Sequence, residues 1–246
     1  MKVVVIIQAR MGSTRLPGKI LKDVAGRPML AQQLRRLQQC PLVDAIVIAT
    51  TTSDADTPVV ELARREGVAW FRGSEQDVLS RFVGAAEQAK AEVIVRSTAD
   101  CPLIDPRITG QVITELMEHA AECDYASNVQ QRTYPRGLDT EAFFMDTLMR
   151  MDRLGESAAA REHVTIVPRA ERPELFLCRD VVDVDDNSDL RWTVDTPEDL
   201  QMVRALYELL GLGERIVPYR EMISYVRTHP EIVRLNQGIE TWSPAR

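Results

Sequence analysis

Short apolar runs alternate along the chain with longer segments in which apolar residues recur at helical spacing. Three runs, at 2–9, 45–50 and 92–97, are rich in β-branched residues and are typical of strands covered on both faces of a sheet. A shorter run at 68–71 predicts a further strand. Together they predict four strands within the first hundred residues.

The segments between and after these runs predict helices. The first begins near Pro28 and carries Leu30, Leu34 and Leu37 on one face, and the others are expected at 53–67, 77–91 and 106–123. Because strands and helices alternate, the sequence predicts an α/β fold with a doubly wound, mostly parallel sheet.

The pattern loosens after residue 124 and returns at 192–211, where a strand end is expected to lead into a long helix. We therefore interpret 124–190 as an inserted lid or subunit-contact region, with a strand at 174–184. No linker or repeat interrupts the chain, which predicts a single domain over 1–246. Its last part, 213–246, is expected to be a helical extension.

The composition restricts the possible partners. The chain has 37 Asp and Glu against 30 Lys and Arg, and a net charge of -7 argues against nucleic-acid binding. The apolar run at 3–7 is too short for a signal-peptide core or a membrane span, so no membrane insertion is expected. The cysteines form no CxxC pair and only three histidines are present, which predicts thiols in a reducing cytoplasm rather than a zinc site.

The loop QARMGSTRLPGK, at 8–19, directly follows the first predicted strand. It is not a P-loop, because five residues separate Gly12 from Gly18 and Ile20 follows Lys19. It still combines glycines, hydroxyls and three cations, which suits a phosphate chain, although a solvated turn has the same composition. Ligands of open parallel sheets bind at this end of the strands, which favours the phosphate site.

Two carboxylates are left without a structural task at the ends of predicted strands. Asp105 precedes Pro106 and Asp199 lies in a helix start, so both are expected to cap helices. Asp100 and Asp195 remain, and two such carboxylates facing a cationic loop could hold Mg²⁺ against a nucleotide polyphosphate.

Three further segments have open interpretations. The acids of DVDD, at 183–186, could be a glycosyltransferase metal motif or a solvated loop. REHVT, at 161–165, could supply a general base or a grip on a carboxylate, or it could be structural. YPRGLDTE, at 134–141, could line a sugar pocket or close a turn.

Six blocks occur together and in order: IIQARMGSTRLPGK, FRGSEQDVLSRF, RSTADCPLIDP, YPRGLDTE, REHVT and RWTVDTPEDL. Over about residues 2–210 the chain resembles the SpsF family of spore-coat polysaccharide biosynthesis proteins, which is related to CMP-Kdo and CMP-acylneuraminate synthetases. The resemblance implies a nucleotide-diphospho-sugar transferase (Rossmann-like) fold and a possible homodimer. It also implies Mg²⁺-dependent activation of an acidic, 2-keto-3-deoxy or related sugar by CTP, with release of pyrophosphate.

Carried over by motif, the resemblance implies three groups of site residues. The catalytic group is Arg15, Lys19, Asp100 and Asp195, with the two aspartates as metal ligands. The nucleotide-binding group is Gln8, Ala9, Arg10, Gly12, Ser13, Arg72, Ser74 and Thr98. The sugar-binding group is Gly137, Asp139, Glu141, Arg161 and His163.

Two other enzyme classes remain open. A sugar-1-phosphate nucleotidylyltransferase would need extra cations for the acceptor phosphate, and five arginines could supply them: Arg132, Arg136, Arg150, Arg153 and Arg161. A glycosyltransferase that uses a nucleotide sugar would use the acids of DVDD.

Overall fold

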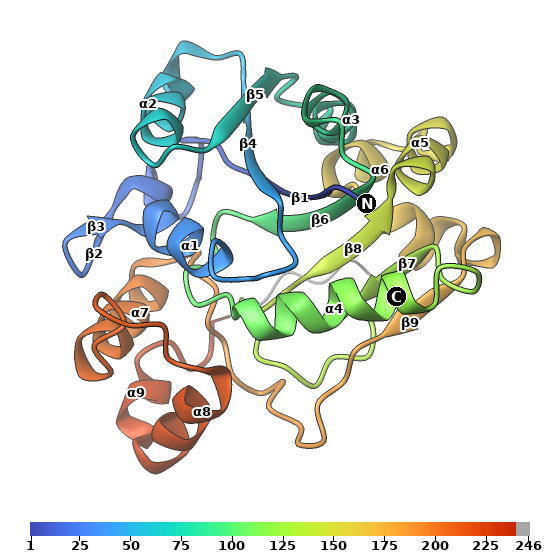
Figure 1. Ribbon diagram of the computed structural model, residues 1–246. Helices are drawn as coiled ribbons and strands as arrows, with labels where there is room; N and C mark the ends of the chain where they lie inside the picture. The colour runs from blue at the N-terminus through green and yellow to red at the C-terminus, as the bar shows by residue number, and fades with distance from the viewer. Residues whose placement is uncertain (240–246) are drawn as a thin grey trace.

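Seven strands form one sheet in the order β5-β4-β1-β6-β8-β7-β9 in the computed structural model, which describes residues 1–239 (Figure 1). The strands are β1 (Val3–Gln8), β4 (Ala45–Thr51), β5 (Ala69–Gly73), β6 (Val93–Thr98), β7 (Tyr125–Ser127), β8 (Glu141–Phe144) and β9 (Cys178–Asp180). The first four are mutually parallel, β8 is antiparallel to both β6 and β7, and β9 is parallel to β7. The mostly parallel sheet predicted from the sequence is confirmed, and so are its first four strands.

The central strand shows why these runs become strands. Side chains of β1 alternate between two separate cores: Val5 and Ile7 pack on one face, and Val4 and Ile6 pack on the other. All four are fully buried. A strand with apolar side chains on both faces is stable only when layers of helices cover the sheet on both sides.

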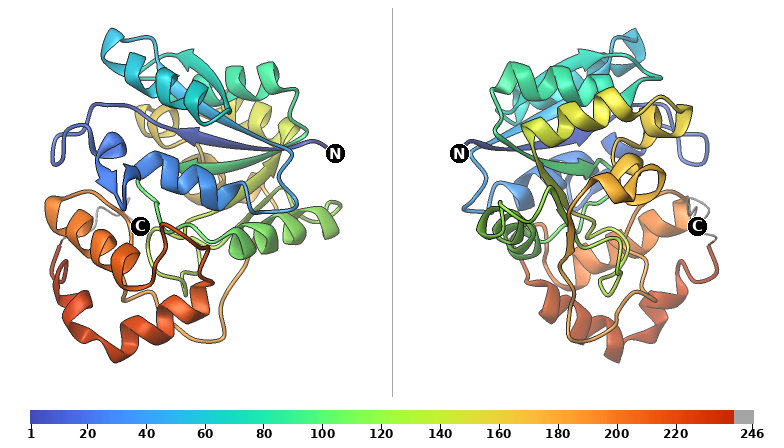
Figure 2. Two further views of the ribbon diagram at one scale, coloured as in Figure 1. Left: turned by 60° about the vertical axis from the view of Figure 1, so that its left-hand side comes forward. Right: turned by 90° about the vertical axis from the view of Figure 1, so that its right-hand side faces the viewer.

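Helices cover both faces, as Figures 1 and 2 show. One core contains side chains of α1 (Met29–Leu37), α2 (Thr57–Arg65) and α4 (Pro106–Glu118). The opposite core contains side chains of α3 (Val78–Ala89), α5 (Met145–Leu154) and α6 (Ala158–His163). The doubly wound arrangement is therefore confirmed.

Short elements fill the connections. A two-stranded hairpin, β2 (Asp23–Val24) with β3 (Arg27–Pro28), precedes α1 and has no counterpart in the sequence prediction. The remaining short elements are single turns: η1 (Lys19–Leu21), η2 (Asp54–Asp56), the π-helical η3 (Val167–Glu171) and η4 (Pro173–Leu175). The strand predicted at 174–184 is shorter than expected because η4 takes up its start, which leaves only β9.

Residues 124–190 are built into the sheet. They supply β7, β8 and β9, and β8 pairs with β6 so that Glu141 lies opposite Arg96. Because the two strands are antiparallel, β8 begins at the edge where β6 ends. The 134–141 segment, which leads into β8, therefore lies at the edge of the sheet where ligands are expected to bind. A lid or subunit-contact role for part of this region stays a prediction.

The last helices are α7 (Pro197–Leu209), α8 (Tyr219–Thr228) and α9 (Pro230–Arg234). The α7 residue Arg204 donates to the carbonyl of Asp23 in the hairpin, and the Tyr219 amide donates to Asp105, which caps α4. The region expected to be a helical extension, 213–246, contains α8 and α9 in its described part, and residues 240–246 lie outside the described residues. Within 1–239, no helix has the length and apolar character needed to cross a membrane.

Candidate active site

A cavity of about 340 Å³ lies where β1 and β6 end and β8 begins. It draws on segments that are far apart in the sequence. Nine of the predicted site residues line it: Gln8, Arg15, Thr98, Asp100, Gly137, Asp139, Glu141, His163 and Asp195.

Lys19 joins the two predicted metal ligands beside this cavity. Its ammonium lies 2.9 Å from Asp195 Oδ1 and 3.4 Å from Asp100 Oδ2, and it donates to the Val194 carbonyl at 2.7 Å. The Val194 amide in turn donates to the Asp100 carbonyl at 2.9 Å, which holds the VDTPED segment against the end of β6. The lysine of the first loop and the two aspartates therefore meet at one point.

The charges of this cluster support one another. Burial alone would lower the pKa of Lys19, but Asp100 and Asp195 outweigh it and raise that pKa. Burial alone would raise the pKa of Asp195, but Lys19, Arg191 and Arg15 lower it. Lysine and carboxylate are therefore both charged at neutral pH.

Arg191 is a member of the site that sequence reasoning missed. It donates to Asp195 Oδ2 at 2.7 Å and makes a two-point pair with Asp199 at 2.9 and 3.0 Å. Asp199 also completes the expected capping box with Thr196 at the start of α7. The sequence feature that could have identified Arg191 is the spacing of Arg191, Asp195 and Asp199 at intervals of four residues. An arginine this close to two acids indicates an ion-pair network.

Hydrogen bonds to Asp56 and within the loop itself fix the conformation of the first loop. The Met11 amide donates to Asp56 Oδ1 at 2.6 Å, and the other oxygen of this buried carboxylate pairs with the Thr51 hydroxyl. The Gly18 amide closes the loop onto the Met11 carbonyl at 3.2 Å, and Gly18 adopts a φ of 66° that favours glycine. Asp56 thus shapes the loop, a role that was not predicted from the sequence.

The other residues assigned to the nucleotide on this loop do not line the cavity. Ala9 is buried and continues the backbone pairing of β1 with β4 through the Ala49 carbonyl. Ser13 accepts the Leu16 amide, and a Cβ at Gly12 would make only ordinary van der Waals contact with the Arg10 side chain, at 3.9 Å. Arg10 forms an exposed ion pair with Glu75 at 3.2 Å.

Arg72 and Ser74 lie at the end of β5, next to the end of β4. The Arg72 guanidinium donates to the carbonyls of Thr51 and Ser53, and the Ser74 hydroxyl accepts the Asp77 amide. Both side chains therefore shape this edge of the sheet, and neither lines the cavity.

A buried charge network forms the wall of the cavity on the side of β8. Glu141 pairs with Arg96 on β6, whose other terminal nitrogen donates to Gln8 Oε1 at 3.2 Å. Glu141 also accepts hydrogen bonds of 2.6 Å from Tyr125 and from Thr165. Arg96 could have been noticed in the sequence as a lone cation within a run that predicts a fully buried strand.

The electrostatics of Glu141 are dominated by arginine. Its side chain is 4% exposed, and burial alone would raise its pKa. Arg96 and Arg169, whose guanidinium lies 3.6 Å away, nevertheless lower that pKa to about 2. Glu141 is therefore a fixed anion, committed to protein cations.

Asp139 and Gly137 shape the rim. Asp139 makes a two-point pair with Arg132 at 2.7 and 2.8 Å and accepts the Gly137 amide. Gly137 has a φ of 104°, and a Cβ there would lie 2.5 Å from the backbone of Trp192. Glycine thus allows this turn to approach the segment that carries Arg191.

Arg136 lines the same cavity, and no carboxylate among residues 1–239 forms an ion pair with it. Burial and the neighbouring guanidinium of Arg132 lower its pKa. Arg136 therefore offers a positive charge to a ligand.

His163 and Arg161 have separate positions although they are close in sequence. His163 lines the cavity, and burial lowers its pKa, which leaves a neutral imidazole at pH 7. Arg161 pairs with Asp152 on α5 at 2.6 Å and lies 3.5 Å from Asp77, so it ties α6 to its neighbours outside the cavity.

The acids of DVDD lie far from this chemistry in the described structure. Asp183 pairs with Arg220 on α8, Val184 is 89% exposed, and none of the four residues lines the cavity. They fasten the segment before Arg191 to the C-terminal helices.

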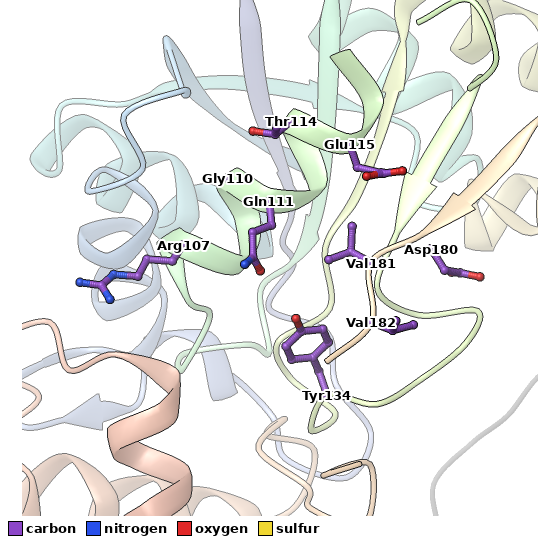
Figure 3. A pocket seen from close by; sticks show the side chains of 9 residues that line it. All are labelled: Arg107, Gly110, Gln111, Thr114, Glu115, Tyr134, Asp180, Val181 and Val182. Carbon is purple, nitrogen blue, oxygen red and sulfur yellow. The ribbon is translucent and has the colours of Figure 1, made fainter. Parts of the chain in front are cut away.

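A larger and more open depression, of about 620 Å³, lies between α4 and the segment after β9 (Figure 3). Figure 3 shows α4 side chains along one side and Val181 and Val182 along the other. Its Glu115 is paired with Arg179, and no predicted site residue lines it. The smaller cavity, with its converging charges, is therefore the candidate active site.

Known proteins with similar sequences identify the family of this chain. The sequence matches the family model described as cytidylyltransferase over residues 4–231. It is 32% identical over 245 residues to the spore coat polysaccharide biosynthesis protein SpsF of Bacillus subtilis (strain 168), covering 93% of this chain and 95% of SpsF. It is 30% identical over 237 residues to a 3-deoxy-manno-octulosonate cytidylyltransferase of Anaeromyxobacter dehalogenans, covering 83% of this chain and 97% of that protein.

A solved structure gives the same result for the fold. The cytidylyltransferase from Leptospira borgpetersenii serovar Hardjo-bovis (strain JB197) superimposes with a TM-score of 0.91 at 33% sequence identity, covering 98% of this chain and 100% of that chain. The nucleotidyltransferase type of fold and the resemblance to SpsF and to Kdo cytidylyltransferases are both confirmed. This chain belongs to the cytidylyltransferase family.

Proposed function

We propose that this protein is a Mg²⁺-dependent enzyme that transfers a cytidylyl group from CTP to an acidic sugar. The acceptor is a 2-keto-3-deoxy sugar acid or a close relative, and the CMP-sugar serves surface polysaccharide or glycan biosynthesis. The observation that carries this proposal is the convergence of Arg15, Lys19, Asp100 and Asp195 from three distant segments. Cations and carboxylates in this arrangement suit a metal-bound polyphosphate.

The donor set fits Mg²⁺. Asp100 and Asp195 present oxygens to a common point beside Lys19. Mg²⁺ is commonly held by one or two carboxylates together with substrate phosphates. No cluster of three or more acid, histidine or cysteine ligands is found within residues 1–239, so substrate oxygens and water would complete the coordination. Bound there, Mg²⁺ would stabilise negative charge on the reacting phosphate.

The reaction would join an acceptor hydroxyl oxygen to the α-phosphorus of CTP and break the bond from that phosphorus to the β-phosphate oxygen. Pyrophosphate and a proton are released. Arg15 and Lys19 would bind the departing pyrophosphate, since both reach the aspartate pair from the first loop. Arg191 would keep Asp195 ionised and oriented. Positioning and charge stabilisation suffice for such a transfer without a covalent intermediate.

The distribution of arginines favours an acceptor with one carboxylate over a sugar phosphate. Of the five arginines that could serve a phosphate, only Arg132 and Arg136 line the cavity, and Asp139 already neutralises Arg132. Arg150 is paired with Asp124. Arg136 is left to bind a single negative charge, and His163 lines the same cavity.

A glycosyltransferase is disfavoured by the position of the DVDD acids, which hold the chain to α8 rather than facing the cavity. The first loop also has cations to spare for a triphosphate.

A thermal-shift panel with CTP, UTP, GTP, ATP and the matching diphosphates, each with and without Mg²⁺, tests the proposal. A ligand at a hundred times its dissociation constant stabilises the fold by about 2.7 kcal/mol. We expect a Mg²⁺-dependent shift with CTP alone, followed by pyrophosphate release when 2-keto-3-deoxy sugar acids are added. A shift with diphosphates but not triphosphates would instead indicate a glycosyltransferase.

A further inference from the structure

We propose that the C-terminal segment positions the catalytic carboxylate Asp195, and that Asn236 is the residue through which it acts. Asn236 follows α9, and its side chain is buried, 6% exposed. Its amide nitrogen donates to Asp199 Oδ1 and to the Arg191 carbonyl, both at 2.9 Å. This inference rests on the proposed function, in which Asp195 holds the metal.

Asp199 is the link between the two. It is fully buried, and besides the hydrogen bond from the Asn236 amide it accepts two from the Arg191 guanidinium. Its Oδ2 also accepts the backbone amides of Asp195 at 2.9 Å and Thr196 at 3.1 Å. The position of the Asp195 backbone is therefore set by a carboxylate that Asn236 helps to hold.

Arg191 extends the link to the Asp195 side chain. Asn236 fixes the Arg191 backbone through its carbonyl, and the Arg191 guanidinium donates to Asp195 Oδ2 at 2.7 Å. Backbone and side chain of Asp195 are thus both fixed through partners that Asn236 contacts. A buried network of this kind is sensitive to the loss of any one donor, because unpaired buried polar groups are costly.

Other residues of the C-terminal segment hold it in the position that brings Asn236 to Asp199 and Arg191. Arg227 on α8 makes a two-point pair with Asp189 and donates to Asn187, just before Arg191. Ile232 on α9 packs into the core. Asn236 is therefore a positioning residue: it contacts neither the cavity nor Lys19, and it acts through Asp199 and Arg191.

The test compares Asn236→Ala and Asn236→Asp with Ile232→Val, which thins the packing of the same segment but leaves the network intact. Asn236→Asp keeps the shape of the side chain and replaces the donor with an acceptor. Two readouts are needed. One is hydrogen exchange of the Asp195 and Thr196 amides relative to β1 amides. The other is Mn²⁺ affinity in the presence of CTP, measured by electron paramagnetic resonance.

Both Asn236 variants should speed exchange of the two amides relative to β1 by about tenfold and weaken Mn²⁺ binding by about tenfold. Ile232→Val should change neither. The proposal is overturned if the Asn236 variants match Ile232→Val in both readouts, or if only the exchange of all amides rises together. If the wild type binds no Mn²⁺ with CTP, the proposed function fails, while the exchange comparison still decides whether Asn236 controls the Asp195 backbone.

Discussion

The first loop and the β8 side of the cavity each carry an ion pair between arginine and glutamate, in different surroundings. On the side of the first loop, Arg10 and Glu75 form a pair whose side chains are 47% and 58% exposed. On the side of β8, Arg96 and Glu141 form a pair whose side chains are 12% and 4% exposed. Water screens the first pair and is excluded from the second, so the energies of the two pairs differ even though their charges are the same.

The difference in exposure suggests that the two ion pairs serve different functions. The exposed side can exchange its protein partners for the phosphates of an incoming nucleotide at little cost. The buried side has its charges fixed before any ligand arrives, with Glu141 held by Arg96, Arg169, Tyr125 and Thr165. A preorganised wall of this kind suits recognition of the acceptor, because no reorganisation is needed during reaction.

The largest effect should come from Glu141→Gln. Removing one partner of a buried ion pair commonly costs 3–5 kcal/mol, because the remaining charge stays buried without compensation. Here two cations, Arg96 and Arg169, would lose their shared anion. Urea denaturation at pH 7 should show a loss of about 4 kcal/mol. The matched control Glu75→Gln, in the exposed pair, should stay close to wild type.

The contribution of Glu141 to the stability of the protein should also depend on pH. The pKa of Glu141 is lowered from 4.5 to about 2, so its stabilising effect is complete above pH 5 and is lost as the pH falls toward 2. Unfolding free energies measured between pH 7 and pH 3 should fall for the wild type. They should fall less steeply for Glu141→Gln. Parallel curves for the two proteins would show that Glu141 does not carry this dependence.

The next effect concerns the cluster of Lys19, Asp100 and Asp195. The substitutions Asp100→Asn and Lys19→Ala should each lower turnover about a hundredfold or more. This corresponds to a loss on the order of 3 kcal/mol in transition-state stabilisation. Pyrophosphate release measures the effect, and far-UV circular dichroism should show an intact fold. Full activity in either variant would remove these residues from the catalytic group.

Lys19→Met should also make stability depend on Mg²⁺. Without the ammonium, Asp100 and Asp195 face each other with one cation fewer, and a bound Mg²⁺ would take its place. The melting temperature of this variant should therefore rise more with Mg²⁺ than that of the wild type. Lys22→Met, a nearby substitution with the same loss of charge, is the control. An equal Mg²⁺ response in all three proteins contradicts the metal assignment.

The same comparison explains what the sequence could predict. The parallel half of the sheet was predictable from its runs of buried strand residues. Asp100 was noticed because it follows such a run, and Asp195 because it stands just before the helix cap Thr196. Lys19 was noticed as one of three cations in the loop that follows β1. Arg96 was missed as a partner of Glu141 because their meeting depends on the antiparallel pairing of β8 with β6, and Arg169 was missed because it reaches Glu141 from η3. The connection from β6 to β8 gives no short-range signal of that pairing, and it is fixed only by packing of the whole sheet.

A smaller effect is expected for Arg136→Ala. A hydrogen bond between charged groups contributes about 1.5–3 kcal/mol, so the KM for a sugar-acid acceptor should rise about twentyfold. The dissociation constant for CTP should change less than twofold if Arg136 binds the acceptor, as proposed. Arg153→Ala, an exposed arginine on α5, is the control for the change in net charge. An unchanged KM would place the acceptor anion elsewhere.

The smallest effect is expected for Glu75→Gln, and it should appear in the affinity for CTP rather than in the free energy of unfolding. In the present structure Glu75 holds Arg10 at 3.2 Å, and a triphosphate bound to the first loop would have to draw Arg10 away from it. Removing the competing carboxylate should therefore tighten CTP binding by about two- to threefold, as expected for an exposed pair. The gain should shrink between 50 mM and 500 mM salt, because screening weakens exposed charges most. Weaker CTP binding by this variant, or a gain that does not respond to salt, would show that Arg10 does not exchange Glu75 for phosphate and that the open side of the site is as fixed as the buried one.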